Sequence, residues 1–294
     1  MSCPRIKQHL STFIGNSKLT CDNFSGACFY INNIKERVPF EKLPLLAARV
    51  CSRRLSVGAD GLMVIEKAEN GGDFKMLFYN SDGSVGEMCG NGARCIARYG
   101  CEHGLASGEE QRIETVSGTV IGRKVSRRQY TVRLNSPTVI DLERRVAADG
   151  EEYVCSYIEL GTPGLPHCVV LMDGWEKLPR EKLRRLGAAL RSHPSFPKGA
   201  NVTFCEITAP NEVGAVTFER GVEDFTLACG TGCGSTALAL SLRGLADKEN
   251  VKITMPGGVL SVAVTDENGA YGLYLTGPTN TVAEGEILDE DLSL

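Results

Sequence analysis

Hydrophobic and polar positions divide this chain into short strand-like segments and a few helix-like ones. Residues 130–134 alternate apolar and polar side chains, the pattern of a strand with one face buried. In residues 40–54 the apolar side chains instead recur at helical spacing, at Leu43, Leu46, Ala47, Val50 and Cys51. The chain therefore mixes the two kinds of element throughout its length.

The predicted elements follow a similar order in the two halves of the chain. In the first half, strands are predicted at residues 11–14, 26–32, 62–66, 74–80, 113–116, 119–125 and 130–134. In the second half, they are predicted at 153–160, 168–172, 201–208, 214–219, 251–255, 258–264 and 271–275. Helices are predicted at 40–54, about 90–103, 180–191 and from 229 to about 244. The charged stretch after Pro137 is a candidate domain boundary.

Two short motifs show that this order is an internal repeat. Cys89-Gly90-Asn91-Gly92 opens one helix-like run, and Cys229-Gly230-Thr231-Gly232 opens another 140 positions later. Phe78 and Phe218 each lie 11 residues before the respective cysteine. The sequence therefore predicts an α/β (α+β) fold of two pseudo-symmetric domains, residues 1–140 and 141–279, with 280–294 packing back on the first. A ligand site is expected between the domains, the usual place for one.

Composition and charge exclude several classes of protein. The chain has 294 residues, of which 42% are hydrophobic and 23% charged, with a net charge of −4. An acidic balance gives no support for nucleic-acid binding. No apolar run is long enough to cross a bilayer, and the first residues lack the apolar segment of a signal peptide. We expect a cytoplasmic protein with neither nucleic-acid nor membrane partners.

The 12 cysteines do not have the spacing of a metal site. Cys89, Cys95 and Cys101 are six positions apart, and no C-x-x-C pair occurs. Cys229 and Cys233 could share a helix face, but no second pair of ligands is evident. We expect no metal and no cofactor, and we expect most of the cysteines to be small buried apolar residues.

The two cysteines at helix starts are in an environment suited to reactive thiols. The first backbone N–H groups of a helix have no internal partner, and the helix dipole is positive there. Such an end binds anions, including a carboxylate, and favours a thiolate over a thiol. Two such ends on one carboxylate would also stabilise the charge that forms when the neighbouring carbon loses its proton.

A pair of thiols is suited to inversion at a stereocentre. One cysteine, as thiolate, would remove the α-proton from one face, and the other, as thiol, would deliver a proton to the opposite face. Two helix caps with buried cysteines would give the same motifs by coincidence. The matching positions of Cys89 and Cys229 favour the catalytic interpretation.

These motifs resemble those of the diaminopimelate epimerase family, which uses neither pyridoxal phosphate nor metal. The strongest matches are Asn80-Ser81-Asp82-Gly83-Ser84 ahead of Cys89, and Glu219-Arg220-Gly221 ahead of Cys229. The resemblance implies two domains, each a curved, mostly antiparallel sheet or barrel around a central helix, with the active site in the cleft. It also implies an isomerase with Cys89 and Cys229 as the acid/base pair.

The resemblance also assigns substrate contacts. The backbones of Gly90, Asn91, Gly230 and Thr231 would receive the carboxylate beside the inverting carbon. The far end of the substrate would be held by Asn80, Asn201, Glu219 and Arg220, whose side chains suit a carboxylate or an ammonium group. The less favoured alternative is that Glu219 and Arg220 form an exposed ion pair at a strand end, which contributes little to stability.

Two pocket positions depart from the family pattern. Ala27 and Leu165 stand where the family has asparagine, and they are 138 positions apart, so they are equivalent in the repeat. An unpaired charged group against them would be costly. A substrate with a smaller or less polar far end, such as histidine or lysine, is therefore an alternative to diaminopimelate.

Other interpretations remain open at this stage. A proline-racemase-like enzyme also uses two cysteines, and a non-catalytic module could bind a carboxylate or zinc. The expected partner is a small amino-acid substrate, and the resemblance makes a homodimer possible.

Overall fold

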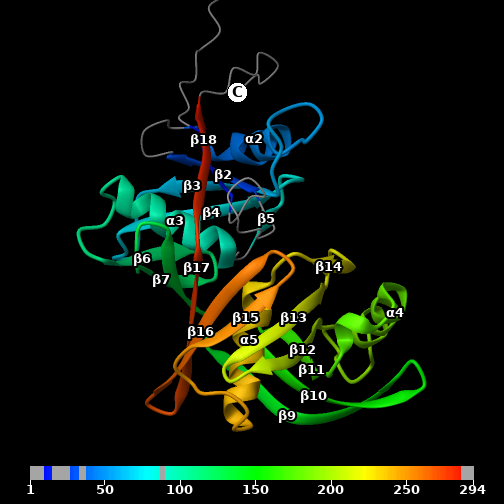
Figure 1. The fold of residues 1–294 in the computed structure, drawn as a ribbon. Helices are drawn as coiled ribbons and strands as arrows, with labels where there is room; N and C mark the ends of the chain where they lie inside the picture. The colour runs from blue at the N-terminus through cyan, green and yellow to red at the C-terminus, as the bar shows by residue number, and fades with distance from the viewer. Residues whose placement is uncertain (1–9, 15–26, 33–37, 87–89, 286–294) are drawn as a thin grey trace, which may run out of the picture. The chain divides into compact units, whose positions relative to one another are not determined.

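A computed structural model of the chain describes residues 10–14, 27–32, 38–86 and 90–285. The chain divides into two compact units, residues 1–132 with 278–294, and residues 133–277. The fold is α+β, as predicted, because strands predominate in both units and each unit encloses a buried helix (Figure 1). In the part of the chain that the structure describes, no helix is long and apolar enough to span a membrane.

The first unit carries the shorter strands. Its strands are β1 (Leu10–Ile14), β2 (Ala27–Asn32), β3 (Gly61–Glu66), β4 (Phe74–Asn80), β5 (Val85–Gly86), β6 (Glu110–Thr115), β7 (Gly118–Lys124) and β18 (Asn280–Gly285). Its helices are α2 (Leu43–Val50), preceded by the 3-10 turn Phe40–Lys42, and α3 (Gly90–Glu102). Strand β8 (Gln129–Leu134) contains the division between the units, at Val132.

The second unit has longer strands and a surface helix. Its strands are β9 (Pro137–Ala148), β10 (Glu151–Leu160), β11 (Leu165–Leu171), β12 (Asn201–Ala209), β13 (Glu212–Glu219), β14 (Asp224–Thr226), β15 (Val251–Met255), β16 (Gly258–Glu267) and β17 (Ala270–Pro278). Its helices are α4 (Arg180–Arg191) and α5 (Gly230–Leu242), with a 3-10 turn at Trp175–Lys177.

Strand pairing repeats between the two units. In the first, β2 is parallel to β3, β3 antiparallel to β4, and β4 parallel to β6, which turns back into β7. In the second, β11 is parallel to β12, β12 antiparallel to β13, and β13 parallel to β15, which turns back into β16. The repeat seen in the sequence is thus a repeat of sheet topology.

Helices α3 and α5 occupy the same place in this order, and both are buried. Residues 92–100 of α3 and 232–241 of α5 are buried, and α5 contacts β10, β11, β12 and β16. Small residues allow such close packing. A Cβ on Gly234 would lie 2.6 Å from Leu134 Cδ1, so a larger residue fits at that point of α5 only if the Leu134 side chain moves.

Helix α4 packs on the second unit through one apolar face. Leu183, Leu186 and Leu190 are buried at helical spacing, in one core cluster with Phe204 of β12 and Phe218 of β13. The opposite face is charged. This core holds β12 and β13 in place, and the candidate site residues Asn201 and Glu219 lie at the ends of these two strands.

The structure differs from the sequence prediction at three kinds of position. Residues after Pro137 were not predicted as a strand but form the twelve-residue strand β9. The helix expected at 40–54 is shorter, because α2 ends at Val50 and a turn follows. The short strands β5 and β14 were not predicted, since two or three residues carry no periodicity.

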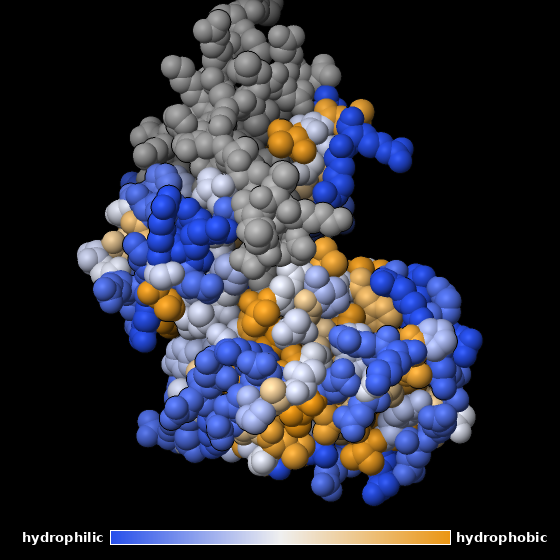
Figure 2. Space-filling model, in the orientation of Figure 1, coloured by the Kyte–Doolittle hydropathy of each residue, from blue (hydrophilic) through white to orange (hydrophobic). Residues whose placement is uncertain are grey.

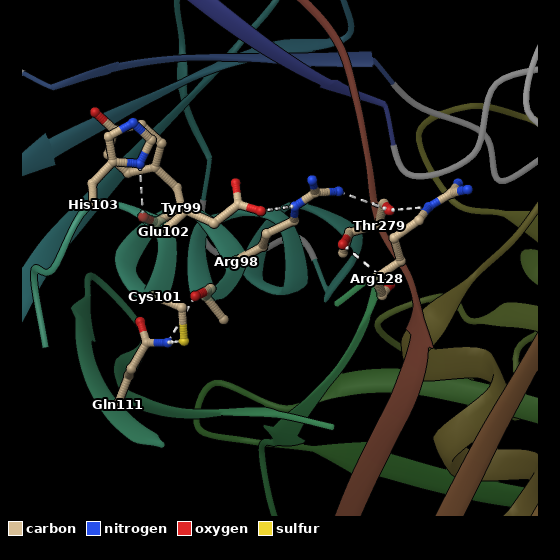
Figure 3. Close-up of polar contacts among 9 residues, drawn as sticks. Arg98, Tyr99, Cys101, Glu102, His103, Gln111, Arg128 and Thr279 are labelled. Atoms are coloured by element: carbon tan, nitrogen blue, oxygen red, sulfur yellow. Dashed lines mark hydrogen bonds and ion pairs between the residues drawn. The ribbon is translucent and has the colours of Figure 1, made fainter. Parts of the chain in front are cut away.

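In the first unit, a polar cluster ties the C-terminal segment to α3. Arg98 donates from Nη1 to the carbonyl oxygen of Thr279 over 3.1 Å, and its Nε lies 2.8 Å from Glu102 Oε1 (Figure 3). Arg128 donates to the same Thr279 oxygen over 3.3 Å, and the Thr279 N–H donates to Arg128 O over 2.7 Å. The chain thus returns to the first unit at a buried residue, since Thr279 is 0% exposed.

We expect Arg98→Met to lower the free energy of unfolding by about 2 kcal/mol, because it removes a charged donor from a buried carbonyl oxygen. The matched control is Arg123→Met, which breaks an exposed ion pair with Glu110 and should cost at most about 1 kcal/mol. Urea unfolding of the two variants measures the difference. Equal losses would contradict a special role for the Arg98 contact.

Hydrophilic side chains cover much of the visible face of the second unit, with hydrophobic patches between them (Figure 2). Its exposed large hydrophobic residues are Val139, Ile140, Val154, Ile207, Val222, Leu227, Leu245 and Val259. Of these, Val222 and Leu227 flank strand β14, close in sequence to Cys229.

Candidate active site

Cys229 is the N-cap of helix α5. Its backbone is extended (φ −120°, ψ 106°), and its sulfur accepts a hydrogen bond from the Gly232 N–H over 3.3 Å. The Thr231 hydroxyl lies 3.6 Å from the same sulfur. The residue is 6% exposed. The sequence therefore placed this cysteine correctly at a helix start, where the glycines let the backbone approach a ligand closely.

The thiol of Cys229 is held in its protonated form. Burial, and then the negative charge of Glu219, raise its pKa well above the ordinary value, although the Thr231 hydroxyl and the Gly232 N–H oppose this. The expectation that the helix start would favour the thiolate is therefore wrong for Cys229 in this structure. Loss of hydration outweighs the helix dipole, which acts only over the first turn.

Glu219, the last residue of β13, is the acidic partner of Cys229. Its Oε1 accepts a hydrogen bond from the Thr226 hydroxyl over 2.5 Å. Burial raises the pKa of Glu219, and hydrogen bonds from Thr226 and from the Cys229 thiol partly oppose that rise. A carboxyl with a raised pKa is a better proton acceptor for a neighbouring thiol than an ordinary carboxylate.

Asn201 and Arg220 meet beside this pair. The Arg220 N–H donates to Asn201 Oδ1 over 2.8 Å, and Asn201 is 6% exposed. The Arg220 guanidinium donates from Nη1 to the Lys198 carbonyl oxygen over 2.7 Å. Among the described residues, Arg220 forms no ion pair with a carboxylate, and its side chain is exposed. The cation is thus oriented by backbone contacts and open to an anionic ligand.

The candidate residues of the first unit are also held by local hydrogen bonds. Asn80 Nδ2 donates to Ser84 Oγ over 2.9 Å, and Asn91 Oδ1 accepts from Arg94 Nη2 over 2.8 Å. Gly90 is the first residue of α3. Cys89 lies outside the described residues, so its predicted role stays a prediction.

The two positions that depart from the family pattern begin equivalent strands. Ala27 is the first residue of β2, opposite Ile14 of β1. Leu165 is the first residue of β11, opposite Leu160 of β10, and is half-buried.

Sequence reasoning assigned no role to His167, which is 0% exposed. In the described part of the chain, neither ring nitrogen has a hydrogen-bond partner. Burial, and then the charge of Arg220, lower its pKa to about 3, so the ring is neutral. His167 pairs in register with Asn201, and its position two residues after Leu165, in the segment that departs from the family pattern, was the signal that could have identified it. Thr226 was missed because a threonine at the end of the three-residue strand β14 has no distinguishing pattern.

No group of three or more metal-ligating side chains gathers anywhere in residues 10–14, 27–32, 38–86 and 90–285.

Solved structures with the same fold include a phenazine biosynthesis protein and an amino-acid epimerase. A phenazine biosynthesis protein of the PhzF family from Bacillus anthracis has a TM-score of 0.69 at 15% identity, covering 97% of this chain and 100% of the other. A hydroxyproline epimerase from Agrobacterium vitis has a TM-score of 0.65 at 16% identity, covering 99% and 95%. At these identities the likeness defines the fold alone, which is that of the PhzF and proline racemase structures.

Sequence comparisons define the class and the family. The profile of the diaminopimelate epimerase family matches residues 26–138 and 161–282. A diaminopimelate epimerase from Aquifex aeolicus is 39% identical over 83% of this chain and 85% of its own length. One from Desulfitobacterium hafniense is 32% identical over 95% and 97%. The protein is thus an isomerase of the amino-acid racemase and epimerase class. It belongs to the diaminopimelate epimerase family.

Proposed function

We propose that this epimerase inverts an amino-acid α-carbon with two thiols, Cys229 and Cys89. The observation that carries the proposal is Cys229 at the N-terminus of α5, where its sulfur accepts the Gly232 N–H and the nearby charge of Glu219 acts on its pKa. A cysteine with a purely structural role has no need of a half-buried carboxyl nearby, whose partial desolvation is unfavourable.

The protonation state of Cys229 before the reaction indicates which proton transfer it can perform first. Cys229 is a thiol in this structure, so it is ready to deliver a proton to the α-carbon. In the reverse reaction Cys229 must be a thiolate, and Glu219 can take its proton, because burial has raised the pKa of that carboxyl. Cys89, at the equivalent position of the repeat, would act on the other face of the carbon.

The helix starts supply the carboxylate site in this proposal. The N–H groups of Gly230 and Thr231 begin α5, and those of Gly90 and Asn91 begin α3. Backbone donors at these ends would bind the carboxylate of the reacting amino acid. They would also stabilise the negative charge that develops there when the α-proton leaves.

Diaminopimelate is the substrate we propose first. Arg220 presents a cation without a carboxylate partner among the described residues, and the planar guanidinium suits the distal carboxylate of such a substrate. Asn80 and Asn201 would hold the distal ammonium or carboxylate beside it. The relatives named diaminopimelate epimerase, with 39% and 32% identity, support the same choice.

A second candidate substrate is a single-centre amino acid such as lysine or histidine. Half-buried Leu165 favours it, because this apolar side chain stands where the family has a polar asparagine. The two candidates differ in whether the far end carries a carboxylate.

A panel of amino acids in D₂O, followed by proton NMR at Cα, tests the proposal. We expect diaminopimelate to exchange its α-proton at least about 100-fold faster than lysine, histidine or proline, because a site built for a polar group strongly rejects analogues that lack it. Faster exchange of lysine or histidine would favour the second candidate. Exchange of none of them would contradict the proposed class of substrate.

A further inference from the structure

A buried carboxyl outside the proposed catalytic pair is connected to Arg220. Glu159, near the end of β10, is 7% exposed. Its Oε1 accepts from the Tyr157 hydroxyl over 2.6 Å, and its Oε2 accepts from the Lys198 ammonium over 2.7 Å. Both carboxylate oxygens are thus occupied within the protein.

The backbone around Glu159 is shaped to admit it. A Cβ on Gly164 would lie 2.2 Å from Glu159 Oε2, so no larger residue fits there without moving the carboxylate. Burial alone would raise the pKa of Glu159, but hydrogen bonds from Lys198 and Tyr157, with the charges of Lys198 and Arg144, lower it below the ordinary value. Glu159 is therefore ionised at neutral pH and stabilised by its neighbours.

Lys198 connects this carboxylate to the candidate site. Its ammonium binds Glu159, and its carbonyl oxygen accepts the hydrogen bond from Arg220 Nη1 over 2.7 Å. The adjacent Gly199 has φ +67°, and a Cβ there would lie 2.9 Å from Arg191 Nη1 and 3.4 Å from Arg220 Cδ. The turn at Lys198 and Gly199 is thus closely packed against Arg191 and Arg220, which limits its movement.

Arg144 holds the loop that carries Lys198 through a further contact. Arg144 of β9 donates to the Ser195 carbonyl oxygen over 3.0 Å, and its guanidinium lies 4.3 Å from the centroid of the Tyr157 ring. Tyr157, which donates to Glu159 Oε1, therefore also packs against the Arg144 guanidinium, and Arg144 binds a carbonyl oxygen of the loop that carries Lys198. Lys198 is the member of the loop that contacts both Glu159 and Arg220.

We propose that Glu159 is a positioning residue that holds Arg220 in place through Lys198. This inference rests on the proposed function for the statement that Arg220 binds a distal carboxylate. The ion pair fixes the Lys198 backbone, and the Lys198 carbonyl fixes the direction of the guanidinium. The Lys198 side chain is more than half exposed (55%) and the Glu159 side chain is buried (10%), so Glu159 is the fixed end of the ion pair.

The substrate dependence of KM is the first part of the test. If Arg220 contacts a non-reacting end of the substrate, its displacement weakens binding more than chemistry. We expect Glu159→Gln and Lys198→Met to raise KM for diaminopimelate about tenfold, which corresponds to about 1.4 kcal/mol, with kcat changed by less than about threefold. Lys198→Arg should have a KM for diaminopimelate close to that of the wild type, because it keeps a cation for Glu159.

The second part does not depend on the substrate. Phenylglyoxal modifies accessible arginines, and mass spectrometry of the Arg220 peptide gives the rate at that residue. We expect Glu159→Gln and Lys198→Met to raise this rate about fivefold, since a loss of about 1 kcal/mol of hydrogen bonding corresponds to such a factor. The control is Glu152→Gln, which breaks the exposed pair of Glu152 with Arg145 in the same unit and should leave the rate unchanged.

The two measurements separate the two proposals. An Arg220 rate equal to that of the wild type in both Glu159→Gln and Lys198→Met overturns the positioning role, whatever the substrate. A raised Arg220 rate with an unchanged KM for diaminopimelate supports the positioning role and contradicts the assignment of Arg220 to the distal carboxylate. Lys198→Met replaces a half-exposed side chain, so it keeps the test valid if Glu159→Gln fails to fold.

Discussion

We expect the Cys229→Ala variant to lose epimerase activity by a factor of about 10³ or more, because the proposed acid/base group for one face of the α-carbon is removed. The general acid–base contribution of such a residue is about 10²–10⁴-fold. We expect Cys89→Ala to lose as much, since each inversion needs both thiols. Initial rates of epimerisation for the purified variants measure both losses.

The matched control is Cys205→Ala. Cys205 is a fully buried free cysteine in β12 of the same unit, and it has no place in the proposed chemistry. Its variant should retain kcat within about twofold to threefold, because a structural cysteine acts as a small apolar residue. Near wild-type rates in either Cys229→Ala or Cys89→Ala would contradict the two-thiol mechanism.

We expect the Glu219→Gln variant to have a kcat about 10²-fold lower in both directions of the reaction. The amide cannot take the Cys229 proton, and an enzyme cannot change the equilibrium constant, so forward and reverse rates fall together. The pH profile should also change. The negative charge of Glu219 helps to raise the pKa of Cys229, so its removal lowers that pKa. Activity that needs the Cys229 thiol will then be lost at a lower pH than in the wild type.

Profiles of kcat/KM against pH, together with rates of Cys229 alkylation, measure this shift. The control is Glu212→Gln at the other end of β13, where Glu212 pairs with Lys252 on the surface. It should change neither quantity. An alkaline limb that stays in place, or moves to higher pH, in Glu219→Gln would contradict the pairing of Glu219 with Cys229.

The sequence predicted much of the fold because the repeat and the periodicity are local signals. Helix α4 has the bounds expected from its apolar spacing, and so do strands β4 and β15. The stretch that forms β9 was misleading, because most of this strand is exposed or half-buried and only Val146 and Ala148 are buried. A strand with so few buried positions does not show the alternation of apolar and polar residues that predicts a half-buried strand.

The candidate site was predictable in part. The Cys229-Gly230-Thr231-Gly232 motif predicted Cys229 at the start of α5, because a helix start depends on a few neighbouring residues. The sign of its pKa shift was wrong, because burial by strands far along the chain decides it. The Glu159–Lys198 contact joins residues 39 positions apart, and no spacing rule connects two such residues. Glu219 was predicted to contact the substrate, and its contact with Cys229 adds a second role that only the folded chain shows.

The central claim is that inversion proceeds by removal of a proton from one face and delivery from the other. The most direct measurement is the position of deuterium early in the conversion of an unlabelled substrate in D₂O, followed by NMR and mass spectrometry. We predict that the inverted product carries one solvent deuteron at its α-carbon, while the recovered substrate still carries protium. Product that keeps its original proton would contradict the two-thiol mechanism, because one base would then have carried that proton across.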